Sequence, residues 1–159
     1  MLLHKLMHNP VMTHLRKPCH KEYARLVLRL AVAGVFMYHG AMKLAGLEGA
    51  AMFFERLGIP MPGAMAVLVA IVEFFGGALV GLGLATRFWS AGHMVIMVVA
   101  ILTAKEIGSF KTYELEFMLL ASSLSLVLSG GGCYSLDAWL MRKGESEHAS
   151  AMPMAAPKA

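Results

Sequence analysis

The chain has 159 residues, of which 58% are hydrophobic and only 15% are charged. An ordinary soluble domain has about 25% charged residues, so this composition excludes the usual soluble globular class and indicates a membrane protein. The formal net charge of +4 fits the excess of Lys and Arg on the cytoplasmic side of membrane proteins, and we do not expect nucleic-acid binding.

Four long apolar runs predict membrane-spanning helices, since about 20 apolar residues are needed to cross the hydrocarbon core. The runs cover residues 23–44, 63–85, 88–104 and 114–131. They do not alternate between polar and apolar residues, so they do not predict a β-barrel. We therefore predict an all-α fold, a four-transmembrane-helix bundle that occupies residues 23–141.

The segments before and after this membrane domain are polar. Residues 1–22 form a basic segment that contains His, Met and one Cys, and residues 142–159 form a tail that we predict to be flexible. His4 and His8 are spaced to share a soft metal ion on a helix. Pro10 interrupts such a helix, so a solvated basic segment is the simpler interpretation and we assign no metal site.

Lys and Arg residues set the expected orientation. They gather before the first span, in the turn between the second and third spans, and after the fourth span: Lys5, Arg16, Lys17, Lys21, Arg25, Arg87, Arg142, Lys143 and Lys158. Because short cytoplasmic loops carry the excess of Lys and Arg, we predict that both termini are cytoplasmic. The first span lacks a small-residue cleavage site, so we expect it to stay as an anchor.

A short helix is predicted between the first two spans, in "EGAAMFFERLG" (residues 48–58). Met52, Phe53 and Leu57 are spaced for one apolar face, and Gly58 ends the run. Such an interfacial helix would cover the outer mouth of the bundle. It could act as a lid over a pocket or only as an anchor at the membrane surface.

Glu73 is the one charged residue of the second span, and a carboxylate at the membrane midplane costs about 2.5–3.5 kcal/mol on insertion scales. Helical spacing places the polar residues of each span on one face. The first span has Arg25, Arg29, Val32, Phe36, His39 and Lys43 on this face. The second has Ala66, Ala70, Glu73, Gly77 and Gly81, the third Ser90, His93 and Met97, and the fourth Glu116, Leu120, Ser123 and Val127.

These faces predict two polar groups at different depths. The first group is His39, Lys43, Glu73 and Glu116, opening toward the outer face. It forms either a functional pocket, since intramembrane carboxylates are costly and usually functional, or a hydrogen-bonded packing contact. The second group is structural, lies toward the inner side and consists of Arg29, Arg87 and Asp137. The small residues Gly77 and Gly81 predict close approach of another helix.

Three stretches resemble the DoxX family of small bacterial inner-membrane proteins. They are "RLAVAGVFMYHGAMKLAG", "FFERLGIPMPGAMAVLVAIVEFFGGALVGLGLATR" and "YELEFMLLASSLSLVLSGGGCYSLDAWL". The resemblance covers about residues 25–140, while the third span matches only in hydrophobicity. The polar residues that recur in the family fall on His39, Lys43, Glu73, Arg87, Glu116 and Asp137.

The resemblance implies a four-helix bundle in the inner (plasma) membrane and gives two hypotheses for function. In the first, the chain is a subunit of a quinone-linked or thiol/sulfur-related membrane oxidoreductase. His39 and Lys43 would then bind a quinone carbonyl, and Glu73 or Glu116 would exchange its protons. In the second, it is a non-catalytic scaffold or assembly factor in a membrane stress-response complex. A transporter or proton pathway is a weaker third alternative.

The sequence contains no motif for a bound redox cofactor. It lacks C-x-x-C, a Rossmann glycine pattern and a haem-attachment motif, so electrons would have to pass through a quinone or a redox protein partner. Cys19 and Cys133 flank the membrane domain. In a reducing compartment they are more simply two free thiols than a redox pair. Besides the lipid bilayer, a second copy of the chain is an open alternative as a partner.

Overall fold

The computed structural model of the chain describes residues 18–104 and 113–151. Over these residues the regular secondary structure is all helical and there is no strand. Six helices follow one another: α3 (Pro18–Ala45), α4 (Leu47–Arg56), α5 (Pro62–Leu82), α6 (Thr86–Ala104), α7 (Glu114–Ser129) and α8 (Leu136–Ala151). The all-α prediction is therefore confirmed for this part of the chain.

Local sequence explains where the helices begin and end. Pro62 lies in the first turn of α5, where its missing N–H and fixed φ are favourable. Gly83 ends the same helix with φ 77°, a left-handed conformation that costs little only for glycine. Gly130 likewise follows the last turn of α7 with φ 73°. These signals place the helix ends close to the limits of the apolar runs.

The main contact of the bundle joins α3 to α5 through glycines. A Cβ atom on Gly40 would lie 2.4 Å from the backbone nitrogen of Phe74, so the two backbones touch there. A Cβ on Gly77 would lie 3.2 Å from the Ala33 oxygen, and one on Gly81 would lie 3.1 Å from the Ala33 Cβ. The prediction that Gly77 and Gly81 allow close helix packing is thus confirmed.

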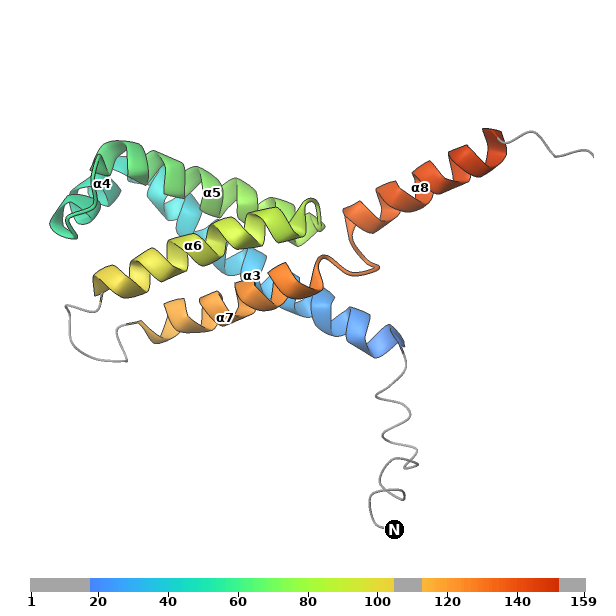
Figure 1. Cartoon of the computed structure of the whole chain (residues 1–159). Helices are drawn as coiled ribbons and strands as arrows, with labels where there is room; N and C mark the ends of the chain where they lie inside the picture. Colours follow the sequence, from blue (N-terminus) through green and yellow to red (C-terminus); the bar gives the residue numbers. More distant parts are fainter. Residues whose placement is uncertain (1–17, 105–112, 152–159) are drawn as a thin grey trace, which may run out of the picture.

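Helices α6 and α7 lie side by side and pack against the α3–α5 pair (Figure 1). The buried apolar core takes residues from all four helices: Val32, Phe36, Val80, Met97, Leu119 and Leu126. Ser90, His93 and Ser123 are also completely buried, so the polar faces predicted for the third and fourth spans do point inward. On α7 the buried line runs through Leu119, Ser123 and Leu126; Leu120 and Val127 are only half-buried.

Three of the described helices are long and apolar enough to cross a membrane: Glu22–Ala45, Pro62–Leu82 and Thr86–Thr103. Helix α7 has 16 residues, which corresponds to about 24 Å at 1.5 Å per residue, less than the ~30 Å hydrocarbon core. The structure therefore supports three spans by length and composition. The fourth span stays a prediction.

Helix α4 lies where the sequence predicts a short helix. Phe54 is its buried residue, 8% exposed, whereas Met52 and Phe53 are each 53% exposed. The side chains of Met52 and Phe53 are thus available to a membrane surface, and the interfacial role of this helix stays a prediction. The less exposed line of α4 includes two alanines, Ala50 and Ala51, whose small side chains allow the helix to pack on α5.

Helix α8 extends away from the other helices (Figure 1). It continues to Ala151, so residues 142–151 are helical where the sequence analysis predicted a flexible tail. No apolar stripe ties this segment to the bundle, but few helix-breaking residues interrupt it either. Most of the N-terminal segment, including His4 and His8, lies outside the described residues, as do residues 152–159.

Candidate functional site

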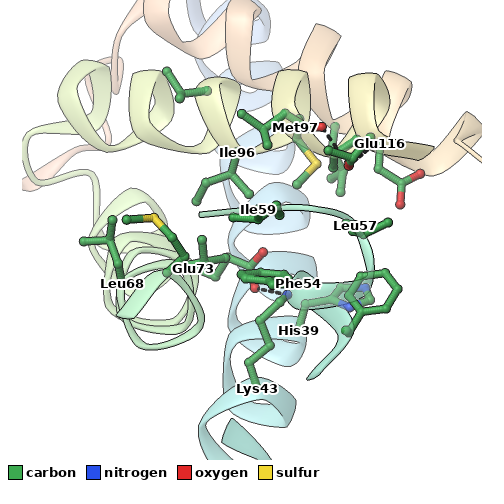
Figure 2. A pocket seen from close by; sticks show the side chains of 18 of the residues that line it. His39, Lys43, Phe54, Leu57, Ile59, Leu68, Glu73, Ile96, Met97 and Glu116 are labelled. Atoms are coloured by element: carbon green, nitrogen blue, oxygen red, sulfur yellow. Dashed lines mark hydrogen bonds and ion pairs between the residues drawn. The ribbon is translucent and has the colours of Figure 1, made fainter. Parts of the chain in front are cut away.

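A cavity of about 350 Å³ lies at the end of the bundle where α4 covers α3 and α5 (Figure 2). Five helices contribute to its walls, and most lining residues are apolar, among them Phe36, Phe54, Leu68, Ile96 and Met97. The polar lining residues are His39, Lys43, Glu73, Thr103 and Glu116. The four residues of the predicted outer group therefore line one pocket. Their roles stay a prediction.

Lys43 and Glu73 form the polar centre of this pocket. The Lys43 Nζ donates a hydrogen bond to the Glu73 Oε2 over 2.5 Å, and the two groups form an ion pair. The Glu73 side chain is 3% exposed and the Lys43 side chain 24% exposed. The close contact of Gly40 with Phe74 brings the two helices near enough for the long lysine side chain to reach Glu73. A neighbouring cation thus compensates a carboxylate that is costly to place inside a membrane.

His39 and Glu116 enter the same pocket from two helices. His39 lies one turn before Lys43 on α3, and Glu116 lies in the first turn of α7. In the part of the chain that the structure describes, neither Glu116 oxygen has a hydrogen-bond or ion-pair partner within the protein. Figure 2 shows Glu116 on a different wall from the Lys43–Glu73 pair. A ligand between these walls can therefore meet polar groups on two sides.

The hydrophobic wall of the pocket includes residues that the sequence analysis did not single out. Phe54 from α4 and Ile59 from the following turn line it beside the ion pair (Figure 2). Leu57, which the sequence places on the apolar face of the short helix, lines it as well. Thr103 adds a hydroxyl that donates within its own helix to the Val99 and Ala100 oxygens. For Phe54 and Ile59, the apolar run "FFERLGI" is the signal that the sequence offered.

His93 supports the floor of the pocket without lining it. Its ring stacks on Phe36, with centroids 3.8 Å apart and planes 7° apart. Its Nε2–H donates to the Val72 oxygen over 3.1 Å, next to Glu73 in the chain. Helical spacing places His93 on the polar face of the third span with Ser90 and Met97. In the structure it is fully buried and fixes the positions of two residues beside the pocket wall.

The second predicted group lies at the other end of the bundle. Arg29 is 2% exposed, and its guanidinium donates to the Gly81, Gly131 and Tyr134 oxygens over 3.2, 2.5 and 2.8 Å. Asp137 accepts a hydrogen bond from the Ala85 N–H over 3.0 Å. Arg87 is exposed and lies over the Gly130 backbone. Arg29 and Asp137 are therefore held mainly by backbone groups, whereas the Arg87 guanidinium makes no hydrogen bond in the described part of the chain.

The cysteine and metal hypotheses receive no support from the described residues. Cys133 is a free, exposed thiol, while the Cys19 side chain lies outside the described part of the chain. Within the described residues, no three His, Cys, Asp or Glu side chains gather as a metal site would require.

The chain is similar to several bacterial membrane proteins. It is 34% identical over 131 residues, 82% of this chain and 96% of the other, to a Bacillus subtilis protein named "Putative oxidoreductase CatD". It is 28% identical to the Escherichia coli "Inner membrane protein YphA", over 70% of this chain and 86% of that one. It is 32% identical to the Mycobacterium tuberculosis "Uncharacterized membrane protein Rv3486", over 74% and 82% of the two chains.

No solved structure matches the chain at a significant level. The sequence profile of the DoxX family matches residues 24–106, which contain α4, α5, α6 and most of α3. This match covers the Lys43–Glu73 pair and the glycine contacts around it. The chain therefore belongs to the DoxX family of membrane proteins.

Proposed function

We propose that the chain is a subunit of a quinone-linked membrane oxidoreductase and that the pocket around Lys43 and Glu73 receives the quinone head group. The observation that carries this proposal is one charged, hydrogen-bonded pair in the wall of an otherwise apolar cavity of about 350 Å³. Small-molecule sites have this character: mainly apolar walls and a few convergent polar groups. A quinone has the matching chemistry, with an apolar ring and carbonyl oxygens that accept hydrogen bonds.

The side chains present fit such a ligand. Lys43 uses one of its three N–H donors on Glu73, so it can direct another toward a ligand oxygen. His39 offers a ring N–H from the same helix, and Glu116 offers a carboxylate from the opposite wall. A bound quinone would supply the two-electron, two-proton redox chemistry. Glu73 and Glu116 would hold or deliver the protons, and a redox protein partner would provide or take the electrons.

The comparison with CatD supports the same class of function, because that protein's name proposes it as an oxidoreductase. That name gives no substrate, so our proposal of a quinone is based on the pocket alone. From the family resemblance, we expect the redox protein partner to use a thiol- or sulfur-containing reductant. The scaffold hypothesis predicts instead a pocket that holds no redox-active molecule.

We further propose the arrangement in the membrane. Helices α3, α5, α6 and α7 would form a four-span bundle, with α4 at the outer interface and both termini in the cytoplasm. The exposed apolar side chains of α7, Phe117, Met118, Leu124 and Leu128, support a lipid-facing helix, and its short length can be met by local thinning of the bilayer. Reporter fusions at both ends should both report the cytoplasm; a periplasmic C-terminus would contradict this arrangement.

The experiment that tests the function is the extraction of bound small molecules. The full chain is purified in mild detergent from its native membrane, and the extract is analysed for quinones by mass spectrometry. We expect a quinone at a stoichiometry near one, and less quinone in the Glu116→Gln variant. Glu114→Gln is the matched control, since Glu114 is exposed and does not line the pocket. An extract without quinone would favour the scaffold hypothesis.

A further inference from the structure

A second cavity, of about 590 Å³, lies at the other end of the bundle. Its lining includes Arg25 of α3, Thr86 and Arg87 at the start of α6, and Asp137 of α8. Arg25 and Lys43 are separated by about 27 Å along α3 at 1.5 Å per residue. The cavity is therefore separate from the pocket around Lys43 and Glu73.

The loop between α7 and α8 shapes this cavity with three consecutive glycines. A Cβ atom on Gly130 would lie 3.2 Å from the Arg87 Nε. One on Gly131 would lie 2.8 Å from the Thr86 Oγ1, which is closer than side-chain carbons approach. The glycines thus let the loop backbone lie directly against Thr86 and Arg87. At these positions the loop therefore faces Thr86 and Arg87 with backbone and not with side chains.

Two hydrogen-bond donors at this wall have no partner in the protein. The Thr86 side chain is buried, with the residue 1% exposed, and its Oγ1 makes no hydrogen bond. Within the described part of the chain, the Arg87 guanidinium makes neither a hydrogen bond nor an ion pair. A buried hydroxyl without a partner costs about 1–3 kcal/mol in protein mutational data. A ligand that accepts from both groups would remove this cost.

The charges around the cavity favour an anion. Arg25, Arg87 and Asp137 line the cavity, while Arg29, Arg142 and Glu22 contact residues of its wall, namely Gly131, Cys133 and Arg25. The Glu22 carboxylate is engaged by Arg25 and by the Cys133 N–H, and Asp137 accepts from the Ala85 N–H. Thr86 and Arg87 also begin α6, and the N-terminus of a helix carries partial positive charge and free N–H groups.

Exposed aromatic side chains surround this end of the bundle. Tyr23 stacks on Tyr134 with ring centroids 5.3 Å apart, and Phe88 and Trp139 are 70% and 54% exposed. Aromatic residues gather at the level of the lipid head groups in membrane proteins. In the membrane arrangement proposed above, the cavity would therefore lie at the depth where phosphate groups of lipids are found.

We propose that this cavity binds a phosphate-type oxoanion through the Arg87 guanidinium and the Thr86 hydroxyl. The anion is the head-group phosphate of an anionic phospholipid or a free phosphate from the aqueous side. Basic pockets between transmembrane helices bind anionic head groups in this way, and guanidinium groups pair with phosphate oxygens in a bidentate geometry. The site does not depend on quinone binding at the other pocket.

The test measures the thermal unfolding of the full chain in neutral detergent at constant ionic strength. One arm adds inorganic phosphate, and the other adds phosphatidylglycerol, with phosphatidylcholine as the neutral lipid. The variants are Arg87→Gln and Thr86→Val. Arg56→Gln is the control, because Arg56 is an exposed arginine at the end of α4, away from this cavity.

We expect at least one anion to raise the melting temperature of the wild type and of Arg56→Gln. The apparent affinity should fall about tenfold or more in Arg87→Gln, as for the loss of a charged hydrogen bond. It should fall several-fold in Thr86→Val. A response to phosphatidylglycerol alone identifies the lipid as the source, and a response to phosphate identifies the free anion.

Two results would overturn the proposal. One is a wild type that responds to neither anion beyond its response to phosphatidylcholine. The other is an Arg87→Gln variant with wild-type affinity. If Arg87→Gln does not fold, Thr86→Val decides, because it keeps the size of the buried side chain and removes only the hydroxyl. Wild-type affinity in Thr86→Val would then contradict the proposed site.

Discussion

The two ends of the bundle bury charge in different ways. At one end, Lys43 and Glu73 form an ion pair in the wall of an apolar pocket. At the other end, the nearly buried Arg29 donates to three backbone oxygens. The first arrangement sets side chain against side chain, and the second ties a side chain to the backbone of α5 and of the loop after α7.

This difference separates a structural charge from one that is available to a ligand. The Arg29 hydrogen bonds join segments that are 52 to 105 residues apart in the chain, so Arg29 connects helices. The Lys43 ammonium uses one donor on Glu73 and faces a cavity. We infer that Arg29 serves mainly stability, whereas the Lys43–Glu73 pair serves mainly binding.

The largest loss of stability is expected for Arg29→Met. The variant removes three hydrogen bonds from a charged donor and leaves three carbonyl oxygens without it, so we expect about 4 kcal/mol of destabilisation. Denaturation of the detergent-solubilised protein, followed by circular dichroism, measures it. Arg25→Met is the control one turn away, because its exposed pair with Glu22 is worth only about 0.5 kcal/mol. Equal losses of stability in the Arg29 and Arg25 variants would contradict the structural role assigned to Arg29.

Gly40→Val should also destabilise the protein strongly, by about 3 kcal/mol. The new side chain would overlap the Phe74 backbone, since a Cβ atom already lies 2.4 Å from its nitrogen. The helices would separate, and Lys43 would lose its reach to Glu73. Gly34→Val on the same helix is the matched control, as nothing lies within 4 Å of a Cβ there. The same denaturation measurement applies, and a Gly40 variant as stable as the Gly34 variant would refute the close packing.

Lys43→Met should cost less, about 2 kcal/mol. Removing one partner of a buried pair usually costs about 3–5 kcal/mol, and Lys43 is partly exposed, which reduces the cost. The double variant Lys43→Met/Glu73→Leu should regain most of the stability, because no unpaired charge stays buried. A double-mutant cycle in detergent measures the coupling. A coupling energy near zero would show that the pair has no role even in stability.

Glu116→Gln should have the smallest effect on stability, within about 0.5 kcal/mol, as for most substitutions away from specific contacts. If the carboxylate meets a ligand, the variant should nevertheless lose several-fold in quinone affinity. Glu114→Gln, two residues earlier on α7, should change neither quantity, since its side chain is exposed and outside the pocket. Calorimetric titration with the quinone compares the two variants. An equal loss of affinity in both would indicate a general effect of surface charge and not a contact between Glu116 and the ligand.

Much of this architecture was predictable from sequence because the helices of a membrane protein follow apolar runs. The residue ranges of α3, α5, α6 and α7 lie close to the predicted spans. Helical periodicity was sufficient to place His39, Lys43, Glu73 and Glu116 toward a common interior, where they line one pocket. Periodicity works here since an intramembrane charge must avoid lipid, which leaves one permitted direction.

Contacts that depend on loops were beyond such reasoning. The Arg29 partners include Gly131 and Tyr134, which lie more than 100 residues away in an irregular segment. The packing of α4 on α5, with Phe54 as its buried residue, was not indicated by the spacing of Met52, Phe53 and Leu57. Gly76 faces Trp89 and His93 of α6. The helical spacing of the polar face of α5 did not indicate this contact.

The most direct test of the account is the affinity of the pocket for a quinone with and without its ion pair. A short-tailed quinone is titrated into the wild type and into Lys43→Met/Glu73→Leu, with circular dichroism to verify that both are folded. We predict that the folded double variant binds the quinone at least about tenfold more weakly, as expected for the loss of a hydrogen bond to a charged group. Equal affinity in the two proteins, or no binding by the wild type, would contradict a ligand-binding role for Lys43 and Glu73.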